Sequence, residues 1–101
     1  MNANIKIILL DFVSNPAITA SWGISNIQVT DEQILFEVSA FKYIGKVIIT
    51  DVGEFVRITL VQNHTEFSTK PNLVLSAIDD MIESDGNYRE NLKNWIVNKI
   101  S

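Results

Sequence analysis

The sequence predicts an α+β fold in which helices at both ends of the chain flank a four-stranded antiparallel β-meander. Three observations predict it. Apolar residues recur at helical spacing near both ends, four segments rich in β-branched and aromatic residues lie between them, and the breaks between these segments are short. Such short breaks require antiparallel hairpins. With 101 residues, 47% hydrophobic and 20% charged, we expect residues 1–101 to form one domain with a proper core.

The first segment predicts a helix over residues 4–14. Its stripe at helical spacing consists of Ile5, Ile8, Leu9, Phe12 and Val13. A strand over residues 5–10 is the competing interpretation, because β-branched residues are dense there.

A second, shorter helix is predicted over residues 16–22. Asn15 is a suitable N-cap, Pro16 fits the first helical position, and Gly23 fits the left-handed position that ends many helices.

Four strands are predicted in the middle of the chain. They cover residues 24–30, 34–41, 46–51 and 55–62. A register that pairs Val29 with Ile34, Phe36 with Ile49, and Ile49 with Val56 gives all four strands one shared apolar face. This inner face consists of Ile27, Val29, Ile34, Phe36, Val38, Ala40, Gly45, Val47, Ile49, Val56, Ile58 and Leu60. We expect it to form the core.

Two further helices are predicted after the sheet, over residues 71–84 and 88–100. The first has an apolar stripe and follows Pro71, which fits a first helical turn. The second begins with a capping-box pattern, Asn87 followed by Glu90. The two stripes are Val74, Leu75, Ile78, Met81 and Ile82, and Tyr88, Leu92, Trp95 and Ile96.

Composition excludes several classes of site. The chain has no cysteine, which excludes disulfides, thiolate metal sites and cysteine nucleophiles. The apolar run at residues 7–10 is too short for a signal peptide or a membrane span, so a cytoplasmic protein with no membrane partner is expected. A net charge of −4 argues against a nucleic-acid partner, which requires a basic surface.

His64 is the one histidine and therefore the first candidate for catalysis. A catalytic histidine needs a carboxylate to orient it and a nucleophile or a water within reach, and Thr65 and Glu66 are its neighbours. Such neighbours are common in polar loops. We interpret His64 as an exposed loop residue and predict that the protein is not an enzyme.

Asp79 and Glu83 share a helix face at i, i+4 spacing, and a divalent cation could bind there. The spacing of a calcium loop is missing, as are the motifs of serine hydrolases and zinc peptidases. We interpret the two carboxylates as part of a solvated helix face, and we predict neither a metal nor a cofactor.

The outer face of the predicted sheet is the strongest candidate for a binding surface. It consists of Gln28, Leu35, Glu37, Ser39, Phe41, Ile44, Lys46, Ile48, Thr50, Phe55, Arg57, Thr59 and Val61. An exposed sheet face is normally polar, whereas this one mixes large apolar residues with charges, which is typical of an interface. One alternative is that a helix covers this face.

We name six residues of the outer face as candidate interface residues: Phe41, Ile44, Lys46, Ile48, Phe55 and Arg57. The predicted register puts Glu37 and Arg57 in the same cross-strand row as Ile48. We interpret the protein as a small non-catalytic interaction module that binds a protein partner or forms a homodimer through this face. A single-stranded nucleic-acid binder that stacks bases on Phe41 and Phe55 is one alternative, and an enzyme centred on His64 is another.

Overall fold

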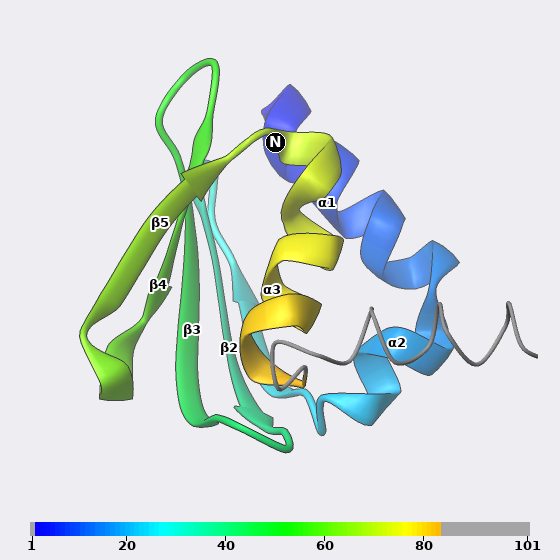
Figure 1. Cartoon of the computed structure of the whole chain (residues 1–101). Helices are drawn as coiled ribbons and strands as arrows, with labels where there is room; N and C mark the ends of the chain where they lie inside the picture. Colours follow the sequence, from blue (N-terminus) through cyan, green and yellow to red (C-terminus); the bar gives the residue numbers. More distant parts are fainter. Residues whose placement is uncertain (1, 84–101) are drawn as a thin grey trace, which may run out of the picture.

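The computed structural model describes residues 2–83 and has an α+β fold (Figure 1). Along the chain, helices come before the first strand and after the last. Five antiparallel strands lie in the order β1-β2-β3-β4-β5, which is also their order in the chain. The predicted helix over residues 88–100 lies outside the described residues. The elements are α1 Ala3–Ser14, α2 Pro16–Ser21, β1 Ser25–Val29, β2 Gln33–Ser39, β3 Ile44–Asp51, β4 Val56–Leu60, η1 Val61–Asn63, β5 Thr65–Thr69, η2 Pro71–Leu73 and α3 Val74–Ile82.

The start of the chain is a helix and not the competing strand. Asn2 caps α1, because its side-chain oxygen accepts a hydrogen bond from the Ile5 N–H at 2.9 Å. Asn15 stands at the N-cap position of α2, as predicted, but its side chain does not cap that helix. Its amide instead donates to the Asp11 carbonyl at 2.8 Å and so closes the end of α1. Gly23 has the predicted left-handed conformation, with φ of 62°.

The prediction of four strands is wrong by one, because β5 follows β4. The chain leaves β4 through the single turn η1 and reverses at His64, which has a left-handed φ of 52°. β5 then pairs with β4, with Phe67 opposite Ile58. The segment Thr65–Thr69 has only one large apolar residue, Phe67, so its alternation is too weak to mark a strand.

The predicted register is confirmed between β1 and β2 at Val29 and Ile34 and is wrong by two residues in the next two hairpins. Phe36 pairs with Val47, and Ile49 pairs with Ile58. The reason is that both connections have four residues rather than two. A slip of two residues returns each side chain to the same side of the sheet, so both predicted faces are retained within the strands. Phe41, Phe55 and Val61 were predicted on the outer face of the strands but lie outside them, in the two turns and in η1.

The core lies between the inner face of β2, β3 and β4 and the helices α1 and α3. Trp22 at the end of α2 is fully buried and stacks on Phe36, with ring centroids 6.3 Å apart. Phe12 from α1 contacts both rings edge to face. The buried residues of the inner face are Ile34, Phe36, Val38, Ala40, Val47, Ile49, Val56, Ile58 and Leu60.

The edge strand β1 departs from the predicted core. Ile27 and Val29 lie on the inner face but are 53% and 40% exposed. The ladder is irregular between Ser25 and Gln28, where Asn26 takes a left-handed φ of 53°, so Ile27 does not pair with Phe36 as predicted. The helices pack against the middle of the sheet and leave this edge uncovered. The two predicted core positions on β1 are therefore wrong.

Candidate functional site

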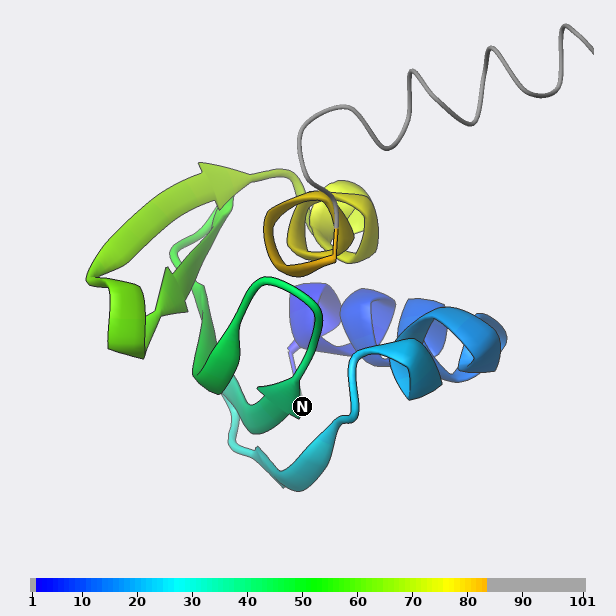
Figure 2. The same cartoon turned by 60° about the horizontal axis from the view of Figure 1, so that its bottom comes forward.

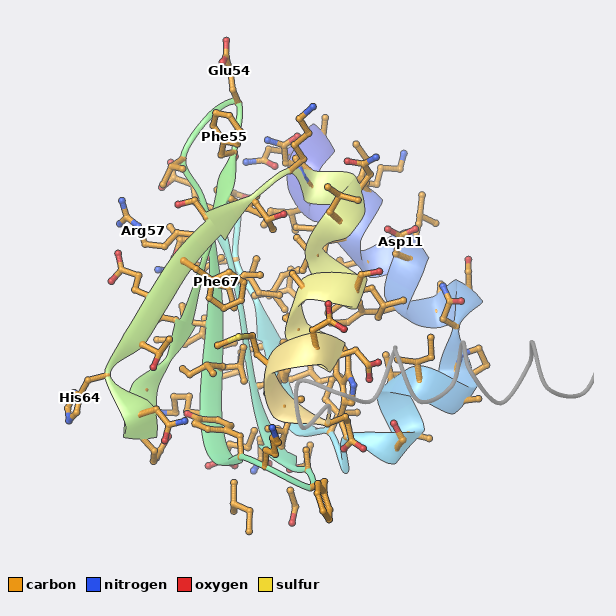
Figure 3. All side chains as sticks on the ribbon, in the orientation of Figure 1. Asp11, Glu54, Phe55, Arg57, His64 and Phe67 are labelled. Atoms are coloured by element: carbon orange, nitrogen blue, oxygen red, sulfur yellow. The ribbon has the colours of Figure 1, made fainter. Side chains whose placement is uncertain are left out.

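The three α-helices within residues 2–83 all lie on the inner side of the sheet (Figures 1 and 2). None of the elements that the structure describes covers the outer face. The alternative that α1, α2 or α3 buries this face is therefore wrong. Figure 3 shows the contrast within the sheet, since Arg57 points away from the helices while Phe67 points toward α3.

The cross-strand rows of the outer face differ from those predicted. Ile48 lies in a row that crosses all five strands, with Gln28, Leu35, Thr59 and Glu66. The predicted neighbours of Ile48 lie in other rows, because Glu37 pairs with Lys46 and Arg57 pairs with Thr50. The two-residue slip of each hairpin accounts for this error.

Apolar residues lie at the centre of the outer face and at the turns that bound it at either end. Leu35 and Ile48 are half-buried in the centre. Phe41 and Ile44 lie at the β2–β3 turn and are 79% and 72% exposed. Phe55 lies at the opposite end of β3, in the β3–β4 turn, and is 46% exposed (Figure 3).

This separation bears on the base-stacking alternative. β3 has 8 residues, so about 23 Å of strand separates the turn that carries Phe41 from the turn that carries Phe55. Two rings so far apart do not form the shared platform on which adjacent bases stack. The geometry gives this alternative no support.

Two charged groups on the outer face, Arg57 and Glu66, form an ion pair within the chain. The Arg57 Nε atom lies 2.9 Å from the Glu66 Oε1 atom, and both side chains are about half exposed. Glu37 accepts a hydrogen bond from the Asn26 side chain and faces Lys46 across the strands. A shallow depression of about 210 Å³ lies here, lined by Asn26, Gln28, Leu35, Phe36, Glu37 and Lys46.

The β2–β3 turn is held in place by Tyr43 and Gln62, two residues that the sequence analysis did not select. Tyr43 is buried, and its hydroxyl lies 2.6 Å from the Lys46 carbonyl oxygen and accepts from the Gln62 N–H at 3.0 Å. The Gln62 side-chain oxygen accepts from the Lys46 N–H at 2.8 Å. A Cβ atom at Gly45 would overlap the Gln62 side chain, so this position requires glycine. The exposed Phe41 and Ile44 therefore lie on a fixed turn.

The end of α3 adds a second attachment to the same turn. The Lys42 N–H donates to the Ile82 carbonyl at 2.7 Å, and the Phe41 N–H donates to Glu83 Oε1 at 3.3 Å. Asp79 Oδ1 accepts from the Trp22 indole N–H at 3.0 Å. The two carboxylates that could have held a cation thus bind protein donors. Within residues 2–83, no three histidine or acidic side chains are grouped so that they could hold a metal ion.

His64 is an exposed residue of the connection between β4 and β5, so its predicted placement in a loop is confirmed (Figure 3). Glu66, its candidate orienting carboxylate, pairs with Arg57. Thr65, the candidate nucleophile, donates its hydroxyl proton to the Asn63 carbonyl at 3.3 Å. The structure places neither group in a relay with His64, and the absence of catalysis stays a prediction.

A second exposed apolar region lies at the uncovered edge of the sheet. It is an open groove of about 340 Å³ between α1, α2 and β1. Val13 at its rim is 72% exposed, the same fraction as Ile44 on the outer face. The groove is lined by Phe12, Val13, Pro16, Thr19, Ile24 and Ile27.

No family model, curated protein or solved structure matches the chain. Within the part of the chain that the structure describes, no helix is long and apolar enough to span a lipid bilayer.

Proposed function

We propose that the protein is a non-catalytic interaction module and that it self-associates through the outer face of its sheet. The observation that carries this proposal is that a sheet face uncovered by α1, α2 and α3 has apolar residues at its centre and at both ends. Ile44, 72% exposed, begins β3 beside a turn with its own hydrogen-bond network, and Phe41 within that turn is 79% exposed. Exposed apolar groups on a rigid support are typical of a protein interface.

The size of the face sets the expected strength of the dimer. Five strands and the length of β3 with its turns give an outer face of about 600 Å². Stable protein interfaces bury about 800 Å² on each partner, so this one lies at the low end of the range. Each copy has a net charge of −4, and the repulsion between two such copies opposes association at low salt. We therefore expect a weak dimer whose population depends on protein concentration.

Sedimentation velocity over a wide range of protein concentrations tests the proposal with two matched variants. Ile44→Asp places a carboxylate on the outer face and leaves the core unchanged. Val13→Asp is the matched control, because Val13 is equally exposed but lies on α1. The wild type and Val13→Asp should shift from monomer to dimer as the concentration rises. Ile44→Asp should remain a folded monomer, because burial of an unpaired charge opposes association.

Ile44 is a better test position than Ile48, because Ile48 is half-buried and its replacement could also disturb the sheet. A wild type that is monomeric at every concentration would overturn self-association. Equal dimerisation of Ile44→Asp and wild type would show that another surface is used. Binding of single-stranded RNA by the wild type, lost in Ile44→Asp, would favour the nucleic-acid alternative instead.

A further inference from the structure

Exposed apolar side chains lie at about equal distances from Ile48 along β3, with Ile44 on one side and Val52 with its turn neighbour Phe55 on the other. Ile44 precedes Ile48 by four residues on β3. Val52 follows Ile48 by four residues, and its N–H donates to the Phe55 carbonyl at 3.1 Å, so Phe55 lies in the row of Val52. Ile44 and Phe55 are therefore each about 13 Å from Ile48 along the strand, in opposite directions.

We infer that two copies pack with their outer faces together about a two-fold axis. The axis runs in the plane between the two sheets, passes over Ile48 and is perpendicular to β3. This inference rests on the proposed self-association. The rotation reverses the strand direction, so the Ile44 end of one copy lies over the Phe55 end of the other, twice. The strands of the two sheets remain close to aligned, which is the common geometry of packed sheets.

The row of Ile48 lies along this axis, so each residue in it meets its own counterpart. Leu35 and Ile48, the half-buried apolar residues, meet Leu35 and Ile48 of the second copy and form the centre of the interface. Glu66 is the one charged residue of the row, and Arg57 already neutralises it. Lys46, two residues from Ile48, faces Thr50 of the second copy.

An axis parallel to β3 would also join the two outer faces, but it fits the residues less well. It would place every residue of β3 over its own counterpart, so Lys46 would face Lys46. Like charges that face each other across an interface oppose association. The same axis would place the apolar Leu35 over the polar Thr59, because β2 and β4 flank β3 on opposite sides. The crosswise axis avoids both contacts.

Thiol cross-linking distinguishes the two axes, because the natural chain has no cysteine. A bifunctional thiol reagent about 10 Å long matches the spacing of packed sheets. Full-length chains carrying Ile48→Cys should give a covalent dimer. Chains carrying only Ile44→Cys, or only Phe55→Cys, should not, since each pair of thiols would be about 26 Å apart. A mixture of the Ile44→Cys and Phe55→Cys chains should give a covalent dimer that contains one of each.

The outcomes separate this inference from the proposed function. A covalent dimer of Ile44→Cys chains alone would overturn the crosswise axis. The crosswise axis would also be overturned if the wild type and all three variants sediment as dimers but no variant, alone or in the mixture, gives a covalent dimer. A monomeric wild type would instead remove the proposed function itself. Val13→Cys on α1 is the control for random collision and should not cross-link.

Discussion

The two faces of the sheet use alternate residues of the same strands, but they differ in how firmly their neighbours constrain them. On the inner face, Phe36 and Ile49 are buried and belong to the apolar core that the helices complete. On the outer face, Leu35 and Ile48 pair with each other across β2 and β3 and are only half-buried. The inner face therefore supports the fold, whereas α1, α2 and α3 leave the outer face uncovered.

The largest expected effect is on the inner face. Phe36→Ala should lower the free energy of unfolding by about 3–5 kcal/mol, because it removes a buried ring between Trp22 and Phe12 and leaves a cavity. Denaturant unfolding measures this loss. Leu35→Ala, at the next position of β2 on the outer face, is the control and should cost less than half as much. Equal losses would remove the distinction between the two faces.

A smaller effect is expected where the sheet meets the start of α1. The Asp51 carboxylate accepts hydrogen bonds from the Asn4 side chain at 2.8 Å, the Gly53 N–H at 3.1 Å and the Asn2 side chain. The Asn4 amide and the Gly53 N–H hold the pKa of Asp51 below its ordinary value of 3.8. Asp51→Asn should cost about 1 kcal/mol at pH 7, since the carboxylate is only half-buried.

The sign of the pH dependence follows from that lowered pKa. The unfolded chain binds a proton at Asp51 at a higher pH than the folded chain, so the stabilisation is complete above pH 3.8 and is lost as the pH falls through the folded pKa. The difference in unfolding free energy between wild type and Asp51→Asn should therefore shrink below about pH 3.8. A constant difference from pH 7 to pH 2 would contradict this assignment. Glu54→Gln, in the same turn, is the control.

The smallest effect is expected at His64, in the connection between β4 and β5. Its left-handed φ of 52° costs a residue with a Cβ atom about 1 kcal/mol, and glycine avoids that cost. His64→Gly should therefore leave the free energy of unfolding unchanged or raise it by up to about 1 kcal/mol. Thermal unfolding measures the change. A clear loss of stability would mean that the imidazole contributes contacts to the fold.

The side of the sheet on which a residue lies could be predicted from the sequence, but its neighbours could not. Alternation assigns Phe36 to the inner face and Ile48 to the outer face, and a slip of two residues leaves both assignments unchanged. The rows depend on the lengths of the connections, and in the β2–β3 connection Tyr43 is buried and bonded to Gln62, nineteen residues away. Nothing local in the sequence marks that contact.

The candidate surface could be predicted only in part, for the same reason. The exposure of Ile44 follows from alternation at the end of a strand. The separation of Phe41 from Phe55, and the symmetry of Ile44 and Phe55 about Ile48, depend on the observed register. β5 was missed because its residues are mostly polar, and the exposure of Ile27 was missed because helix coverage is a property of tertiary packing.

The agreement between strand order and chain order has a consequence for how the chain folds. Every ladder in the sheet joins neighbouring segments, so the sheet forms from four successive hairpins, each closing a short loop at a small cost in entropy. The helical layer is different, because Asn4 meets Asp51 across 47 residues and Trp22 meets Asp79 across 57. These contacts close much longer loops than the hairpins do, so we expect the helices to complete the core after the hairpins supply a surface to pack against.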